Sequence, residues 1–163
     1  MAEIERLIRA AVVDVTLETP TSGDARWCLD EYFRELAGRF DTGFDPAKSN
    51  PARDEEVTPP AGFFAVARLD GYPVGCGALK RKDKTTGEIK RMWTAPSARG
   101  RGVARKVLQA LETAAREFGL TTLQLETNRT LTEAQALYRK AGYREVDPFN
   151  DEPYAHHWFE KNL

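Results

Sequence analysis

The feature that most constrains the fold is a strand–helix–strand segment at residues 88–127. It starts with the strand-like run 88–94, continues through a helical pattern at 102–118 and ends in the alternating run 121–127. The helical pattern places one apolar stripe on one face, made of Val103, Val107, Leu111, Ala114 and Phe118. A crossover of this kind joins parallel strands and is right-handed in nearly all proteins. We therefore expect one parallel strand pair connected through this helix.

The segments on either side of the crossover predict an α/β (α+β) fold with an antiparallel front half. Asp70-Gly71 is a hairpin signal between two strand-like runs. Thr132 and Gln135 have capping-box spacing at the start of another helical run, and Gly142 stands where a left-handed residue ends it. The other expected elements are strands at 12–18, 62–69, 72–80, 143–146 and 156–160, and helices at about 24–40 and 132–141.

Length and composition indicate a single soluble domain. The chain has 163 residues, which fits one domain, here residues 12–163. Residues 1–11 are an N-terminal extension whose apolar spacing suits a short helix. No apolar run is long enough to cross a membrane and no signal-peptide pattern precedes the domain, so we expect a cytoplasmic protein. Cys28 and Cys76 lack metal-ligand spacing, which predicts reduced core thiols and no metal site.

The charge of the chain is concentrated in its middle. The net charge is −1, but residues 71–106 alone carry 10 basic and 2 acidic side chains, a local excess of +8. A basic segment in a nearly neutral protein indicates a polyanionic ligand at one place. Proteins that coat nucleic acid are usually basic throughout, and Trp93 is the only aromatic residue between 80 and 106. We therefore expect neither a nucleic-acid partner nor a membrane partner.

The basic segment contains a glycine turn directly before the long helix, Arg99-Gly100-Arg101-Gly102-Val103-Ala104. Glycines let a backbone approach a ligand closely, and the first turn of a helix offers unpaired N–H groups. This geometry binds phosphates. The spacing is neither a P-loop nor a dinucleotide-binding fingerprint. From the residues alone, a phosphate site and an ordinary turn before a solvated helix stay equally open.

Three segments of the chain resemble the GNAT superfamily of N-acetyltransferases. Arg99-x-x-Gly102-x-Ala104 is similar to the family's acyl-CoA signature, residues 88–96 to its fourth strand, and residues 136–143 to its Leu-Tyr…Gly-Phe/Tyr segment. The resemblance covers about residues 12–160. It implies a mostly antiparallel sheet of about six to seven strands with a splayed parallel pair. It also implies acetyl transfer from acetyl-CoA to a primary amine by direct attack in a ternary complex, or alternatively a non-catalytic acyl-CoA sensor.

The resemblance also implies which residues hold the cofactor. The turn Arg99, Gly100, Arg101, Gly102, Val103 and Ala104 is expected to bind the coenzyme A pyrophosphate. The backbone of Met92, Trp93 and Thr94 is expected to bind the pantetheine arm, and Asn128 to bond the pantetheine or the acceptor, although a turn role fits it equally. Family members often have Asn or Gln seven residues before the tyrosine of the Leu-Tyr segment. This chain has Leu131 there, which removes a polar cofactor contact.

Candidate acid and base residues follow from the chemistry of amine acetylation. Tyr138 is the expected acid for the departing thiolate, since a phenol near pKa 10 and a thiol near 8.5 can exchange a proton. Attack also requires a neutral amine. Glu88 is the first candidate for the base, acting directly or through a water, and Glu126 on the following strand is the second.

The acceptor end is the least determined part of the sequence. The loop at 38–60 is expected to cover it, with Phe40 and Phe44 lining a pocket and Arg39 pairing with a substrate carboxylate. Core packing for the two rings and simple solvation for the arginine are the alternatives. The acceptor itself, a small-molecule or peptide amine, is not identified by these residues. A monomer and a homodimer fit equally well, and residues 1–11 are a candidate dimer contact.

Overall fold

The structure is a computed structural model that describes residues 12–49 and 52–163. The extension predicted at residues 1–11 lies outside the described residues. Each strand and helix predicted between residues 12 and 163 is found, with ends shifted by at most two residues. The strands are β1 (Val13–Leu17), β2 (Gly62–Leu69), β3 (Tyr72–Arg81), β4 (Thr86–Thr94), β5 (Thr122–Thr127), β6 (Arg144–Val146) and β7 (His157–Asn162), and the α-helices are α2 (Gly23–Arg39), α3 (Val103–Glu117) and α4 (Thr132–Lys140).

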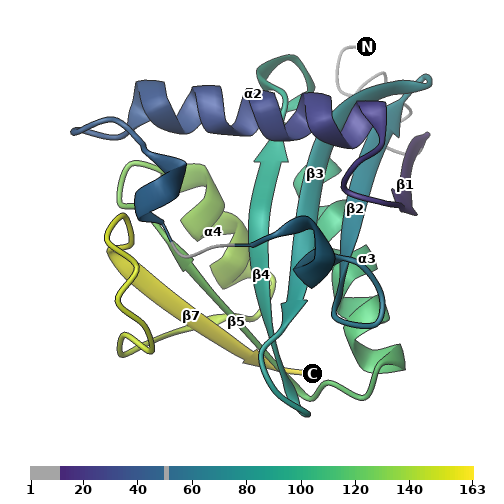
Figure 1. Cartoon of the computed structure of the whole chain (residues 1–163). Coiled ribbons are helices and arrows are strands. Elements are labelled where there is room, and N and C mark those ends of the chain that lie inside the picture. The colour runs from purple at the N-terminus through teal and green to yellow at the C-terminus, as the bar shows by residue number, and fades with distance from the viewer. Residues whose placement is uncertain (1–11, 50–51) are drawn as a thin grey trace.

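All the strands join one sheet in the order β1-β2-β3-β4-β5-β7-β6 (Figure 1). Every neighbouring pair is antiparallel except β4 and β5, which run parallel and are connected through α3. The predicted mixed sheet and its single parallel crossover are confirmed. The hairpin signal also holds, because Asp70 (φ 52°) and Gly71 (φ 84°) both adopt the left-handed conformation that a tight β2–β3 turn requires.

Helices α2 and α3 cover opposite faces of the sheet. On one face, Trp27 of α2 packs edge-on against Trp93 of β4, with ring centroids 5.7 Å apart. On the other face, α3 lies over β2 and β3 and buries Val103, Val107, Leu111 and Ala114 of the predicted stripe together with Leu108, whereas Phe118 at the end of the stripe is 37% exposed. Burial of side chains of this size stabilises a fold by about 1.5–3 kcal/mol each. None of the described helices has the length and apolar content needed to cross a membrane.

Strands β4 and β5 pair over a short stretch and then diverge (Figure 1). Thr86–Glu88 are in register with Thr122–Gln124, and within the described residues the pairing ends there. Further along β4, Arg91 and Met92 together oppose the single residue Gly77 of β3. Arg91 has a left-handed backbone, with φ 60°. A bulge of this kind bends a strand, so the backbone itself opens a gap between β4 and β5.

Two local details differ from the sequence predictions. The capping box of α4 is wrong: Leu131 is the N-cap residue and no side chain caps it. The amide of Gln135 instead donates to the carbonyls of Asn128 and Arg129, at 3.3 Å each. The segment predicted as a loop at 38–60 contains two short 3-10 helices, Pro46–Lys48 and Asp54–Val57. The predicted left-handed Gly142 (φ 93°) is confirmed, and Cys28 and Cys76 are free and buried as expected.

Replacing Gly77 with alanine is expected to destabilise the protein by about 1–3 kcal/mol, the usual cost of overpacking a core. An added Cβ would lie 2.6 Å from the Met92 sulfur and 2.7 Å from a Val107 methyl. Gly23→Ala is the matched control, because a Cβ there meets nothing within 4 Å at the start of α2. Urea unfolding measures both variants. Equal stability of the two would contradict the close packing of α3 against the β4 bulge.

Candidate active site

Two adjoining cavities meet where β4 and β5 diverge. The larger, about 250 Å³, follows β4 to the N-terminus of α3, and we call it the turn cavity. The smaller, about 100 Å³, lies between α2, β4, the end of β5 and the segment around Tyr154, and we call it the Glu126 cavity. Six residues line both: Tyr32, Leu36, Met92, Leu131, Ala134 and Tyr138.

The turn cavity contains most of the residues that the sequence assigned to a phosphate-bearing ligand. Gly100 (φ 78°) and Gly102 (φ 77°) are both left-handed, and no side chain caps the N-terminus of α3. A Cβ at either glycine would meet nothing within 4 Å, so the space beside the turn is open to a ligand. The predicted residues that line this cavity are Met92, Trp93, Thr94, Arg99, Gly100, Gly102, Val103 and Ala104. Arg101 is not among its lining residues, whereas Arg105 is.

Arg99 and Trp93, which both line the turn cavity, differ in whether their polar groups have partners. The guanidinium of Arg99 pairs with Glu35 of α2, which fastens the turn to that helix. The indole N–H of Trp93 is buried and has no hydrogen-bond partner within the described residues. A buried donor without a partner is costly, so this indole is an unsatisfied polar group of a residue that lines the turn cavity.

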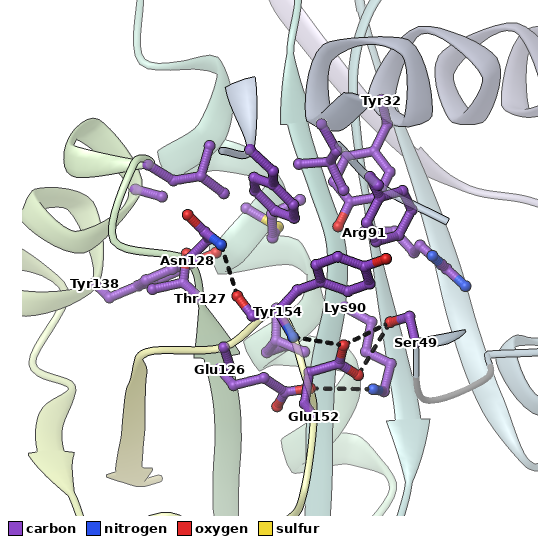
Figure 2. Close-up of a pocket in the computed structure, with 18 residues that line it drawn as sticks. Tyr32, Ser49, Lys90, Arg91, Glu126, Thr127, Asn128, Tyr138, Glu152 and Tyr154 are labelled. Atoms are coloured by element: carbon purple, nitrogen blue, oxygen red, sulfur yellow. Dashed lines mark hydrogen bonds and ion pairs between the residues drawn. The ribbon is translucent and has the colours of Figure 1, made fainter. Parts of the chain in front are cut away.

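Glu126 is a largely buried carboxylate in the wall of the Glu126 cavity (Figure 2). Its side chain is 10% exposed, and one carboxylate oxygen lies 3.5 Å from the ammonium of Lys90. The other oxygen is buried and has no partner among the described residues. Burial raises the pKa of Glu126, and the nearby Lys90 ammonium only partly opposes this shift. Such a carboxylate takes up a proton more readily than a solvent-exposed one does.

Glu88, the first candidate base from the sequence, lies on β4 where this strand is still paired with β5, before the gap begins. Its carboxylate is 3.6 Å from the Lys90 ammonium. Glu88 lines neither cavity, whereas Glu126 lines the smaller one. The structure therefore brings Glu126 to the gap rather than Glu88, because Glu88 is in the last residue pair before the strands separate.

Tyr138 of α4 stands between the two cavities and lines both. The residue is 5% exposed, and its ring packs near those of Tyr143 and Phe159, with centroids 5.9 Å and 6.1 Å away. Burial raises the pKa of its hydroxyl. The phenol is protonated at neutral pH, as it would be at the ordinary tyrosine pKa of about 10, and the shift makes it a weaker acid than an exposed tyrosine.

Tyr32 of α2 is a site residue that the sequence did not reveal. It also lines both cavities, and burial raises the pKa of its hydroxyl to about 12, an effect that the nearby Arg91 opposes. In the sequence it belongs to the aromatic stripe of α2, which is indistinguishable from a core-facing stripe. Only the position of α2 across the β4–β5 gap distinguishes this tyrosine from its neighbours.

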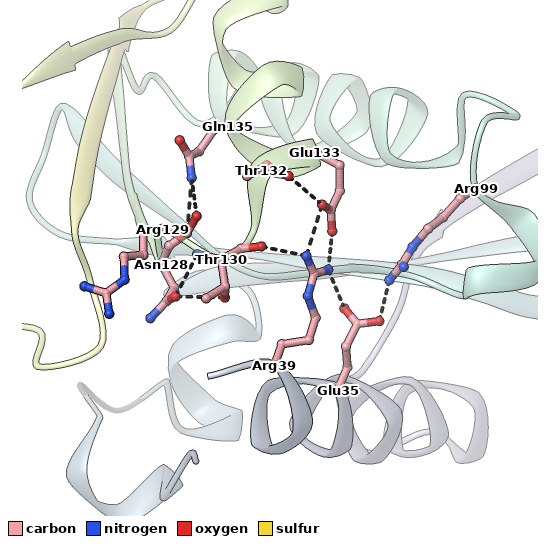
Figure 3. Close-up of polar contacts among 9 residues, drawn as sticks. All are labelled: Glu35, Arg39, Arg99, Asn128, Arg129, Thr130, Thr132, Glu133 and Gln135. Atoms are coloured by element: carbon pink, nitrogen blue, oxygen red, sulfur yellow. Dashed lines mark hydrogen bonds and ion pairs between the residues drawn. The ribbon is translucent and has the colours of Figure 1, made fainter. Parts of the chain in front are cut away.

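Asn128 has its polar atoms engaged in the turn after β5 (Figure 3). Its side-chain oxygen accepts from the backbone N–H of Thr130 at 3.0 Å and from its hydroxyl at 2.9 Å. Its amide donates to the carbonyl of Tyr154 at 2.7 Å. Asn128 lines the Glu126 cavity and not the turn cavity. The geometry thus favours the turn role over the predicted cofactor contact.

The residues expected at the acceptor end divide into two groups. Phe40 and Phe44 line the Glu126 cavity, as expected for pocket residues. Arg39 lines neither cavity, because its guanidinium pairs with Glu133 and donates to the Thr130 carbonyl at 2.7 Å (Figure 3). It joins the end of α2 to the start of α4 and is not positioned to bind a substrate carboxylate.

The mixed sheet, the glycine turn before α3 and the gap between two parallel strands define the architecture of a coenzyme A-dependent acyltransferase. The family described as "Acetyltransferase (GNAT) family" matches residues 28–143. The chain belongs to this family.

Individual relatives agree with the family match. An IAA acetyltransferase of Azospirillum brasilense is 36% identical over 145 residues, which cover 88% of this chain and 90% of that protein. A Klebsiella pneumoniae structure described as an acyl-CoA N-acyltransferase has a TM-score of 0.75 and 27% identity, covering 94% of this chain and 99% of that one. A GNAT family acetyltransferase from Elizabethkingia anophelis, solved with acetyl-CoA bound, shares the fold (TM-score 0.64, 18% identity, 93% and 98% coverage).

Proposed function

We propose that the protein transfers an acetyl group from acetyl-CoA to a primary amine, with both substrates bound at once. The observation that carries this proposal is the meeting of the two cavities at the β4–β5 gap, with Tyr138 in their common wall and Glu126 at the edge of the smaller one. One cavity is lined by a glycine turn suited to phosphates, and the other by a buried carboxylate suited to an amine.

The turn cavity fits acetyl-CoA, which supplies an acetyl group activated as a thioester. The start of α3 behind the left-handed Gly102 provides backbone N–H groups and positive dipole character for the pyrophosphate, and the space beside Gly100 and Gly102 is open to it. The bulged strand residues Met92, Trp93 and Thr94 line the route from this turn to the gap. Leu131 also lines that route, so the polar contact common in the family is absent here.

Glu126 and Tyr138 take the proton-transfer roles in this proposal. Glu126 accepts a proton from the acceptor ammonium, directly or through a water, which frees the lone pair for attack. Tyr138 donates a proton to the departing thiolate. A covalent acetyl-cysteine step is not required. Neither Cys28 nor Cys76 is among the lining residues, and burial raises the pKa of Cys76 well above its usual value. A protonated, buried thiol is a poor nucleophile.

Thermal unfolding with acetyl-CoA, free coenzyme A and ATP, combined with thiol release from acetyl-CoA, tests the proposal. Ligand at 100 times its Kd adds about 2.7 kcal/mol of stability. We expect both coenzyme A species, but not ATP, to raise Tm by several degrees, and an amine to release thiol. Stabilisation without thiol release for any amine would indicate the sensor function instead.

Gly102→Ala is expected to weaken acetyl-CoA binding, and Gly119→Ala is its matched control. The two glycines lie at opposite ends of α3, have φ of 77° and 80°, and have open space around the missing Cβ. Each substitution forces alanine into a left-handed conformation at a cost of about 1–2 kcal/mol. Only Gly102 belongs to the turn cavity, so only its variant should lose the thermal shift with acetyl-CoA. Equal shifts in the two variants would remove the turn as the cofactor site.

A further inference from the structure

Four charged side chains line the Glu126 cavity, namely Lys90, Arg91, Glu126 and Glu152, and the proposed acetyl transfer gives Arg91 no role. Arg91 lines this cavity from the β4 bulge, and its left-handed backbone sets the direction of its side chain. The guanidinium lies 4.8 Å from the centroid of the Phe33 ring and forms no ion pair with any residue in the described part of the chain. Neighbouring Lys90, by contrast, has Glu88 and Glu126 as partners.

Arg91 and Glu126 lie on different sides of the Glu126 cavity (Figure 2). In Figure 2, Arg91 extends on the side of Ser49, away from Thr127 and Asn128, while Glu126 reaches in from β5. The other lining carboxylate, Glu152, accepts from the Ser49 hydroxyl at 2.9 Å. Glu126 keeps one buried oxygen without a partner within the described residues. The cavity wall therefore includes one oxygen of Glu126 without a hydrogen-bond donor and the guanidinium of Arg91 without an ion-pair partner, both within the described residues.

We propose that the acceptor is a small free amino acid, with its amine at Glu126 and its carboxylate at Arg91. This inference rests on the proposed acetyl transfer. A guanidinium binds a carboxylate through paired, charge-assisted hydrogen bonds. The volume of about 100 Å³ suits a small acceptor, and Phe40, Phe44 and Tyr154 provide an apolar wall for its side chain. A diamine would leave Arg91 without an anion.

Matched pairs of amino acids and their decarboxylated amines test this acceptor class. L-Leucine and isoamylamine share the same side chain, as do L-phenylalanine and phenethylamine. With acetyl-CoA and the full chain, thiol release should be faster with the amino acid of each pair. Arg91→Gln should raise KM for the amino acids about 10- to 100-fold, the expected loss of a charged hydrogen bond. It should leave KM for the amines and the thermal shift with acetyl-CoA unchanged.

Two further variants make the test specific. Arg34→Gln removes an exposed guanidinium from α2 outside both cavities, and its kinetics should match those of the wild type. Arg91→Asn places a residue that tolerates the left-handed backbone at the bulge, and it should reproduce the selective rise in KM if Arg91→Gln fails to fold. Faster reaction of the decarboxylated amines, or an equal effect of both Arg91 variants on amines and amino acids, overturns the amino-acid acceptor but not acetyl transfer. Binding of acetyl-CoA without thiol release for any acceptor overturns both.

Discussion

Replacing Tyr138 with phenylalanine is expected to lower kcat about 100-fold or more while acetyl-CoA affinity changes little, because general acid catalysis contributes about 10²–10⁴-fold. The ring would keep its packing beside Tyr143 and Phe159. The variant lacks only the hydroxyl that we propose as the proton donor for the thiolate. This hydroxyl is protonated in the wild type at neutral pH, because burial raises its pKa further above the ordinary value of about 10. Steady-state kinetics and thermal unfolding with acetyl-CoA separate the two effects.

Two other tyrosines serve as comparisons for this variant. The hydroxyl of Tyr143 donates to Glu112 at 2.8 Å and lies outside both cavities, so Tyr143→Phe should lower stability and leave kcat unchanged. Tyr32 lines both cavities and is the competing acid. A large loss of kcat in Tyr32→Phe together with near-normal turnover in Tyr138→Phe would transfer the acid role to Tyr32.

The fold was largely predictable because its decisive signals are local. The stripe of α3, the Asp70-Gly71 turn and the alternation of β5 each determine one element, and handedness then determines the crossover. The capping box of α4 was wrong because Thr132 and Gln135 have the required spacing, while the backbone carbonyls of the β5–α4 turn compete for the Gln135 amide. Sequence spacing alone does not reveal such competition.

The lining of the turn cavity was predictable from the sequence, and that of the Glu126 cavity much less so. The glycine turn is continuous in sequence, so its residues remain together after folding. The Glu126 cavity combines residues from α2, β4, β5 and the segment around Tyr154, and the distances between them depend on how far the β4–β5 gap opens. Strand alternation does not tell Glu88 from Glu126, since only the end of pairing at Glu88 separates them. Likewise, nothing local to Arg39 indicates that Glu133 pairs with it.

The exchange of Glu126 for glutamine is the second large effect, an expected loss of about 100-fold in kcat/KM for the acceptor. Glutamine keeps the shape of the side chain but cannot accept the ammonium proton. Glu88→Gln decides between the two candidate bases. If Glu126 is the base, the Glu88 variant retains most of its activity. A severe loss confined to Glu88→Gln would assign the base role to Glu88 instead.

The pH dependence of stability gives Glu126 a signature that a structural role does not share. Burial raises its pKa above the usual value of 4.5, so the folded protein binds this proton more tightly than the unfolded chain does. As pH rises from 4.5 through the raised pKa of Glu126, the wild type loses stability. The glutamine variant has no titrating carboxyl group at this position, so it does not lose stability for this reason. Urea unfolding at pH 5 and pH 8 should therefore show that Glu126→Gln gains stability relative to the wild type at the higher pH.

The wild-type activity should fall as pH drops through the same pKa, because the base is then protonated. A variant that instead becomes relatively less stable at pH 8 would mark Glu126 as a structural partner of Lys90, since losing that ion pair would then outweigh the relief of a buried charge.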